Sequence, residues 1–162
     1  MPPEPTAVRL VAALAAGGLT VATAESLTGG LIGAAITAVS GASAVYRGGV
    51  ITYATELKAT LGAVPDDVLA LHGPVAAETA VAMARGVRES CGADWAISAT
   101  GVAGPDPQDG HAPGEVWLGF AGPDGTAESV RIDASGDREA VRTAAVRAAL
   151  SGLLVRLAAA SS

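Results

Sequence analysis

Residues 20–30, Thr20-Val-Ala-Thr-Ala-Glu-Ser26-Leu-Thr28-Gly29-Gly30, decide the fold of this chain. A short run of residues that favour β-structure leads into a turn with hydroxyl side chains, and two glycines then open a pattern with helical spacing. Such a strand, turn and helix start direct backbone N–H groups and the positive end of the helix dipole toward an anion. The carboxyl end of a strand is also where open α/β sheets bind ligands. We therefore expect a small phosphorylated substrate to bind here and Ser26 to take part in the chemistry.

The rest of the chain alternates helical and strand patterns, with strand–helix units early and a hairpin late. The expected helices cover residues 5–16, 28–38 and 55–62, a longer stretch whose apolar face runs from residue 76 to residue 91, and the C-terminal stretch that Asp137 or Ser135 caps. The expected strands cover residues 20–25, 46–53, 94–100, 115–121 and 128–134, and the last two flank the hairpin turn Pro123-Asp124-Gly125. Gly48-Gly49 indicates a bulge or a close backbone approach in the second strand. This mixture predicts a single domain over residues 1–162, a three-layer α/β/α sandwich with a mixed sheet.

Composition and charge exclude several classes of partner. The net charge of −6 provides no basic field, so we expect neither a nucleic acid nor an anionic membrane as partner, and no apolar run is long enough to span a bilayer. Cys91 is the only cysteine and continues a core stripe, so we expect it to be buried and inert. With two histidines and no zinc spacing, we expect neither a metal nor a cofactor. The apolar run 8–16 resembles a signal peptide, but cleavage after residue 24 would remove the first strand, so we expect a cytoplasmic protein.

Lys58 is the single lysine in a chain with nine arginines. Arginine stays protonated at accessible pH, whereas a desolvated lysine can act as a base, so the sequence indicates an amine with a function here; the alternative is a solvated surface lysine. A Ser–Lys pair can cleave an amide without histidine or aspartate. The candidate hydroxyl groups belong to Ser26, Thr28, Ser43, Tyr53, Ser98 and Thr100. Thr55-x-x-Lys58 echoes the S-x-x-K spacing, but Ser26 and Thr28 could equally be a turn residue and an N-cap, so spacing alone leaves the choice open.

Two glycine loops and two arginines are candidates for binding an anion. Thr28-Gly29-Gly30-x-x-Gly33 only loosely resembles a dinucleotide loop, because the G-x-G-x-x-G register is missing. Thr100-Gly101-Val102-Ala103-Gly104-Pro105 follows a strand and either presents N–H groups to an oxyanion or phosphate or simply connects two elements. Arg138 and Arg142 share a helix face and either clamp a phosphate or are solvated. Asp106, Asp109 and His111 are more typical of a solvated loop than of a metal site.

These motifs occur in the order of a known family. Residues 24–30, Ala-Glu-Ser-Leu-Thr-Gly-Gly, resemble the A-E-S-x-T-G-G signature of the CinA C-terminal family. Further similar motifs are Ser40-Gly41-Ala42-Ser43, Tyr46-x-Gly48-Gly49, Tyr53 followed by Lys58 and Gly62, Ser98-Ala99-Thr100-Gly101-x-Ala103-Gly104-Pro105, Gly114-x-Val116-Trp117 and Ser135-Gly136-Asp137-Arg138. The resemblance covers nearly the whole chain, from about residue 8 to the C-terminus.

The resemblance implies a nicotinamide-nucleotide amidohydrolase. Such an enzyme hydrolyses the carboxamide of nicotinamide mononucleotide to nicotinate mononucleotide and ammonia, without metal or cofactor, and so recycles pyridine nucleotide. It also implies an α/β/α fold and a homo-oligomer, with a dimer expected. The functional positions that it implies here are Ser26, Ser43, Tyr53, Lys58, Thr100 and an arginine near Arg142. One departure is Ala54-Thr55, which stands where relatives often have Ser-Asn and puts substrate specificity or rate in question.

The mechanism that we expect combines these observations. The 5′-phosphate binds N–H groups around residues 28–30 or 101–104, with Arg138 or Arg142 nearby. Ser26 attacks the carboxamide while a neutral Lys58, aided by Tyr53, takes its proton, and glycine-loop N–H groups with Thr100 stabilise the oxyanion. Direct attack by water, with Lys58 as base, stays open. The other hypotheses are a non-catalytic nucleotide-binding or adaptor module and a different small amidase or phosphate-ester hydrolase on the same scaffold.

Overall fold

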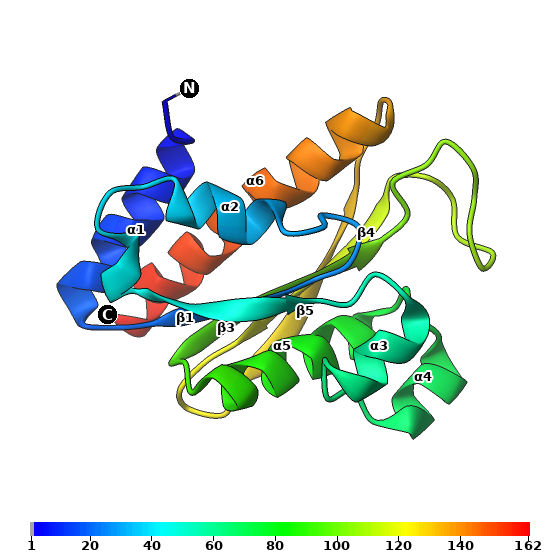
Figure 1. The fold of residues 1–162 in the computed structure, drawn as a ribbon, viewed down its shortest axis with the longest axis horizontal. Coiled ribbons are helices and arrows are strands. Elements are labelled where there is room, and N and C mark those ends of the chain that lie inside the picture. Colours follow the sequence, from blue (N-terminus) through cyan, green and yellow to red (C-terminus); the bar gives the residue numbers. More distant parts are fainter. Residues whose placement is uncertain (1) are drawn as a thin grey trace.

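A five-stranded mixed sheet forms the middle layer of the computed structural model, which describes residues 2–162 (Figure 1). Across the sheet the strands are β2 (Tyr46–Ile51), β1 (Val21–Glu25), β3 (Trp95–Gly101), β4 (Glu115–Ala121) and β5 (Ala127–Asp133). β1 pairs in parallel with β2 and β3, whereas β4 pairs antiparallel with β3 and β5. The carboxyl ends of β1, β2 and β3 therefore meet at one edge of the sheet.

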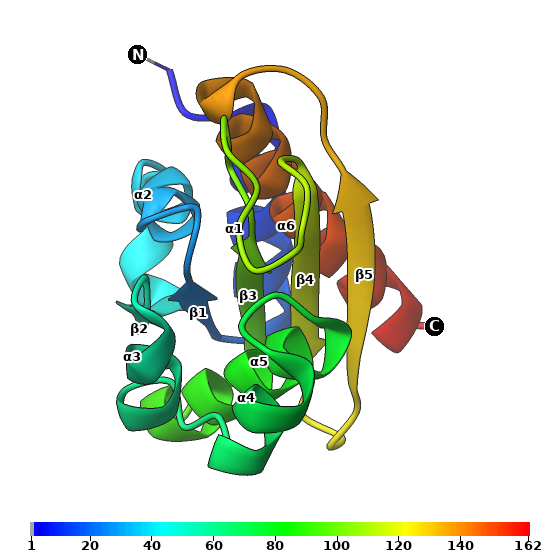
Figure 2. The same ribbon diagram turned by 90° about the vertical axis from the view of Figure 1, so that its right-hand side faces the viewer.

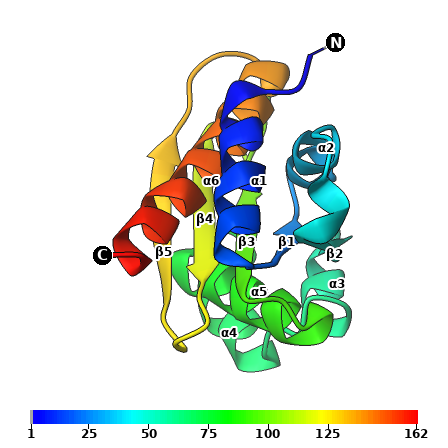
Figure 3. The same cartoon turned by 90° about the vertical axis from the view of Figure 1, so that its left-hand side faces the viewer.

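Helices cover both faces of this sheet (Figure 1, Figure 2). One face carries α1 (Pro5–Gly17), α2 (Leu31–Thr37) and α6 (Arg138–Ala160), and the other carries α3 (Thr55–Thr60), α4 (Asp66–His72) and α5 (Ala77–Cys91). α1 and α6 pack side by side, in front of β3 and β4 in the view of Figure 3. The predicted three-layer α/β/α sandwich with a mixed sheet is confirmed, as is the β4–β5 hairpin.

Small and aliphatic side chains fill the space between the layers. The α1 and α6 side of the sheet buries Leu10, Leu14, Ile97, Leu118, Phe120, Leu150 and Leu153, and the α5 side buries Ala22, Ala24, Met83, Ala84 and Ala96. Gly152 in α6 lies so close to the ring of Phe120 that a Cβ would overlap it. This close approach seats α6 on the sheet.

The edge strand β2 also approaches its neighbour through a glycine. Gly49 lies against the carbonyl group of Thr23, with no room for a Cβ, and the pairing register shifts near Gly48, whose φ is +135°. The close approach predicted at Gly48-Gly49 is confirmed. The strand ends at Ile51 rather than at residue 53, so Tyr53 lies beyond the sheet edge.

The helix predicted over residues 28–38 begins later than the pattern indicates, at Leu31. Gly29 and Gly30 adopt positive φ values of 58° and 102°, which continue the turn instead of the helix. The side chain of Glu25 then accepts hydrogen bonds from the first helical N–H groups. A residue that precedes the turn thus caps this helix.

Three further differences concern the second half of the chain. α4 was not predicted; it follows Pro65 and ends at Gly73, whose φ is +77°. Cys91 is partly exposed rather than buried, although it packs against the α5 side of the core. α6 begins after Asp137, whose side chain accepts the N–H of Ala140 at 2.9 Å as an N-cap. An 18-residue stretch of α6 has a mean hydropathy of 1.4. Its length and composition alone would let it cross a membrane, whereas the sequence analysis expected no apolar run of that length. The core helices of globular proteins also meet these two criteria.

Candidate active site

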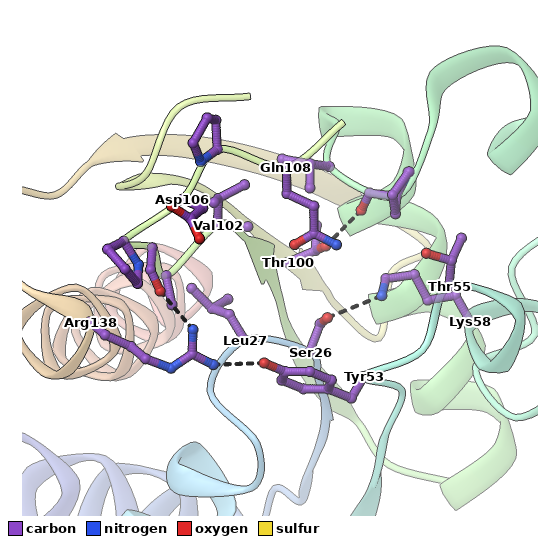
Figure 4. Close-up of a pocket in the computed structure, with 17 residues that line it drawn as sticks. Ser26, Leu27, Tyr53, Thr55, Lys58, Thr100, Val102, Asp106, Gln108 and Arg138 are labelled. Carbon is purple, nitrogen blue, oxygen red and sulfur yellow. Dashed lines mark hydrogen bonds between the residues drawn. The ribbon is translucent and has the colours of Figure 1, made fainter. Parts of the chain in front are cut away.

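A cavity of about 410 Å³ opens at the sheet edge where β1, β2 and β3 end (Figure 4). Ser26 enters it from the end of β1, Tyr53 from the segment after β2, and Thr100 from the end of β3. Lys58 reaches it from α3, the loop over residues 101–108 forms one wall, and Arg138 enters from the first turn of α6. The volume lies within the range of small-molecule sites. The topology thus gathers polar side chains from six segments around one hollow.

Ser26 and Lys58 form a buried pair inside this cavity. The Lys58 Nζ lies 3.0 Å from the Ser26 Oγ and 2.9 Å from the carbonyl oxygen of Thr52. Only 2% of Lys58 and 7% of Ser26 are exposed, and no carboxylate of the described chain forms an ion pair with the amine. Burial lowers the pKa of Lys58 from 10.5 to about 8, and the more distant charge of Glu56 opposes this weakly. A hydroxyl within hydrogen-bond distance of an amine that loses its proton this readily is the arrangement of a nucleophile and its base.

Arg138 bridges two sides of the cavity (Figure 4). Its Nη2 donates to the Tyr53 hydroxyl at 2.7 Å and its Nη1 donates to the carbonyl oxygen of Gly104 at 2.8 Å. Both acceptors are neutral, and within residues 2–162 no Asp or Glu pairs with Arg138. The cavity therefore has a cation at its wall with no carboxylate in ion-pair contact, although the carboxylate of Asp106 also lines the cavity. A guanidinium without an ion-pair partner favours an anionic ligand.

The cavity wall contains three backbone N–H groups without an acceptor and one hydroxyl oxygen that can accept a hydrogen bond. The backbone N–H groups of Leu27, Ala103 and Gly104 find no acceptor within the described chain, although these residues are buried. Because these three residues line the cavity, their N–H groups are candidate donors to a ligand. Thr100 donates its hydroxyl proton to the carbonyl oxygen of Pro74 at 2.6 Å. In this arrangement the hydroxyl proton is engaged by Pro74, so the Thr100 oxygen is offered to a ligand as an acceptor. That Thr100 stabilises an oxyanion stays a prediction.

Other candidates lie outside the cavity. Thr28, Gly29 and Gly30 do not line it, and the N–H groups of Gly29 and Gly30 are bonded to the Ser26 carbonyl oxygen and the Glu25 carboxylate. The phosphate site expected at residues 28–30 is therefore not part of this cavity. Arg142 donates to the carbonyl oxygens of Leu27 and Thr28 at 3.0 and 3.3 Å and so supports the turn from behind.

Two predicted hydroxyl groups also lie elsewhere. Ser43 is exposed in a short 3-10 helix, η1 (Ala42–Ala44), which precedes β2 and so lies at the opposite edge of the sheet from Ser26. Ser98 is buried in β3 and donates to the carbonyl oxygen of Ala80, a bond that holds β3 to α5. Gly101 and Gly104 do line the cavity, as expected. Within the part of the chain that the structure describes, no three His, Cys, Asp or Glu side chains are grouped to hold a metal ion.

Sequence reasoning missed several residues of the site. Pro74, Val75 and Gln108 were not predicted as site residues, yet all three line the cavity. Nothing local marks them, because only the folding of the chain brings them to the edge of the sheet. Glu25 had one signal, since it is the only charged residue in a strand of small and apolar side chains.

The chain is similar to known proteins along most of its length. Residues 4–157 match the family described as the CinA C-terminal domain. A CinA-like protein of Frankia casuarinae is 51% identical over 132 residues, which cover 81% of this chain and 30% of that protein. A putative competence-damage inducible protein of Halalkalibacterium halodurans is 43% identical over 149 residues, which cover 92% of this chain and 36% of that protein. The chain thus spans about a third of the length of these curated relatives. The crystal structure of a CinA superfamily protein from Klebsiella pneumoniae superposes with a TM-score of 0.91 at 38% identity, covering 94% of this chain and 96% of that chain.

Proposed function

The chain belongs to the CinA C-terminal domain family, and on that premise we propose that it hydrolyses the carboxamide of nicotinamide mononucleotide to nicotinate mononucleotide and ammonia. The single observation that carries the proposal is the buried contact of 3.0 Å between the Ser26 Oγ and the Lys58 Nζ. An amine whose pKa is lowered to about 8 is neutral in about one molecule in ten at pH 7, and the neutral form can take a proton.

The chemistry then proceeds in two balanced halves. The neutral amine of Lys58 takes the hydroxyl proton of Ser26 while the Oγ–C bond to the carboxamide carbon forms. The resulting ammonium gives its proton to the amide nitrogen, the C–N bond breaks, and ammonia leaves from an acyl-Ser26 intermediate. Water attacks this ester while Lys58 takes a proton from it, the C–Oγ bond breaks, the Lys58 ammonium returns the proton to the Ser26 Oγ, and the acid product is released. In the alternative that stays open, Lys58 activates the water directly and no acyl intermediate forms.

Two groups of the cavity wall suit the two ends of a carboxamide. The N–H of Leu27, the residue directly after the nucleophile, is a free donor and can stabilise the oxyanion as the equivalent N–H does in other serine hydrolases. The Thr100 oxygen, whose proton is committed to the Pro74 carbonyl, can accept an N–H of the carboxamide. A donor for the oxygen and an acceptor for the nitrogen support an amide rather than an ester as substrate.

The phosphate is best accommodated at the opposite wall. The free N–H groups of Ala103 and Gly104 lie on the loop beside Arg138, and the guanidinium has no carboxylate partner there. Arginine and backbone N–H groups together bind phosphate with charge-assisted hydrogen bonds. Tyr53, which accepts from Arg138, would keep the guanidinium directed at the cavity.

The direct test is ammonia release from nicotinamide mononucleotide, with the acid product identified by mass. Wild type should release one ammonia per acid formed, and both Ser26→Ala and Lys58→Arg should reduce the rate by about 10³-fold or more, because arginine keeps the charge but cannot act as a base. Ser43→Ala is the matched control and should keep the wild-type rate, because this serine is exposed and lies outside the cavity.

Each other outcome has a clear meaning. Wild-type rates in Lys58→Arg would refute the assignment of the base. Binding of the mononucleotide without ammonia release would favour the non-catalytic nucleotide-binding or adaptor module. Release from a panel of other amides or phosphate esters, but not from the mononucleotide, would favour a different hydrolase on this scaffold.

A further inference from the structure

We propose that Glu25 is a positioning residue for Ser26: its buried carboxylate ties the first turn of α2 to the end of β1 and thereby holds the serine hydroxyl against the Lys58 amine. The inference rests on the proposed function for its kinetic consequence. It concerns a residue that does not line the cavity and that would touch no substrate.

The contacts of Glu25 are unusual for a charged side chain. Only 2% of the residue is exposed, and no Lys, Arg or His of the described chain pairs with it. Its Oε1 accepts the N–H groups of Gly30 and Ile32 at 3.2 and 2.9 Å, and its Oε2 accepts the N–H of Gly33 at 3.0 Å. A carboxylate buried without a cation is costly unless hydrogen bonds compensate it. Here these three hydrogen bonds from the start of α2 provide the compensation, so the carboxylate and this turn require each other.

The same residue is fixed through its backbone. The carbonyl oxygen of Glu25 accepts the N–H of Thr52 at 2.8 Å, and the N–H of Ser26 donates to the carbonyl oxygen of Ala99 at 2.9 Å. The peptide that joins Glu25 to Ser26 is therefore held by both neighbouring strand ends. The carboxylate adds a third restraint from α2, on the far side of the turn that contains Ser26.

Thr52 links this arrangement to the base. Its N–H is bonded to Glu25, and its carbonyl oxygen accepts from the Lys58 Nζ at 2.9 Å. The backbone of Glu25 thus positions both residues. Ser26 follows it directly in the chain, and Lys58 is connected to it through the hydrogen bonds of Thr52. A loosened turn would move the Ser26 Oγ relative to the amine, and a misplacement of about 1 Å can cost about 10²-fold in rate.

The packing around the Glu25 carboxylate leaves little room for a different side chain or a different arrangement of the turn. A Cβ on Gly33 would come 2.6 Å from the Tyr46 hydroxyl and 3.5 Å from the Glu25 Oε2. The Tyr46 hydroxyl is itself within 2.6 Å of the Thr23 Oγ1. Glutamine at position 25 would keep the shape but direct its NH₂ group at one of the N–H donors. Aspartate would keep the charge but is one methylene too short to reach all three donors.

The test compares Glu25→Gln with Asp94→Asn in the full chain. Asp94 accepts the N–H and the hydroxyl of Thr20 at 2.8 and 3.1 Å, at the opposite end of β1. Asp94→Asn is therefore the matched control: it also removes a carboxylate that supports β1, but at the end of the strand far from Ser26. We expect Glu25→Gln to lower kcat for nicotinamide mononucleotide by about 10²-fold with KM within about twofold, while Asp94→Asn keeps kcat. Glu25→Asp should shift kcat in the same direction and serves if Glu25→Gln does not fold.

A second readout separates this inference from the proposed function. An aryl sulfonyl fluoride modifies the serine directly: the Oγ–S bond forms, fluoride leaves, and the hydroxyl proton passes to Lys58. Its rate with Ser26, located by mass spectrometry, should fall in Glu25→Gln by a factor similar to kcat. If wild type releases no ammonia, the proposed function is refuted but this ratio still tests Glu25. Equal rates in Glu25→Gln and wild type, or equal losses in Glu25→Gln and Asp94→Asn, would overturn the positioning role.

Discussion

Replacing Lys58 with methionine should abolish hydrolysis and at the same time stabilise the protein, by an amount that depends on pH. Lys58 is 2% exposed and its pKa falls from 10.5 in the unfolded chain to about 8 in the native protein. A tenfold change in proton affinity corresponds to about 1.4 kcal/mol, so burying the ammonium destabilises the native protein by about 3 kcal/mol at pH 7. Methionine has a similar length and removes this destabilisation.

The sign and the pH window follow from which state binds the proton. Below pH 8 the amine is protonated in both states, and the full destabilisation is present. Between pH 8 and 10.5 the native amine loses its proton first, so the unfolded state binds more protons and wild-type stability rises with pH. At pH 10 about 1 kcal/mol of the destabilisation remains. Methionine loses the hydrogen bonds to Ser26 and Thr52, about 1 kcal/mol each, but this loss is the same at every pH.

The assay is urea unfolding of both proteins at several values between pH 7 and pH 10. Lys58→Met should be more stable than wild type by about 1 kcal/mol at pH 7, and the difference should fall by about 2 kcal/mol and change sign by pH 10, where Lys58→Met is less stable by about 1 kcal/mol. Every other titrating group is shared by the two proteins and cancels in the comparison. A difference that stays constant within about 0.5 kcal/mol over this range, well below the change expected from linkage, would refute the reasoning, because it would mean that the amine keeps its ordinary pKa in the folded protein.

Two further predictions concern the same site. The rate of hydrolysis should rise with pH to a plateau with a midpoint near the native pKa of Lys58, about 8, and by roughly fivefold between pH 7 and pH 8; a rate that is independent of pH over this interval would contradict a lysine base. Arg138→Met should raise KM for nicotinamide mononucleotide by about 10- to 100-fold without affecting a nucleoside substrate that lacks the phosphate. Arg142→Met should instead lower the free energy of unfolding by about 1–2 kcal/mol, because its hydrogen bonds support the turn; the assignment of the phosphate to Arg138 fails if KM rises equally in both.

Much of the fold could be predicted from local patterns. The alternation of strand and helix patterns predicted the layers, Pro123-Asp124-Gly125 marked the hairpin, and Asp137 was a correct N-cap. Each of these signals depends on a few neighbouring residues, whose dihedral preferences and spacing are written directly in the sequence. The sequence pattern did not predict α4, because this helix is short and its apolar residues do not form a clear stripe. None of its residues is buried.

The sequence by itself determined that a serine lies at the carboxyl end of a strand and that the chain offers one side-chain amine. Only the tertiary structure decided that this amine, 32 residues further on, lies 3.0 Å from the serine. It also decided that Arg138 enters the cavity while Arg142, one helical turn away, supports a turn, and that Glu25 accepts the N–H of Gly30, one of the groups expected to bind a phosphate. Periodicity reports which residues share a face. The partner that this face meets depends on strand register and on the packing of helices from distant parts of the chain, which no local pattern contains.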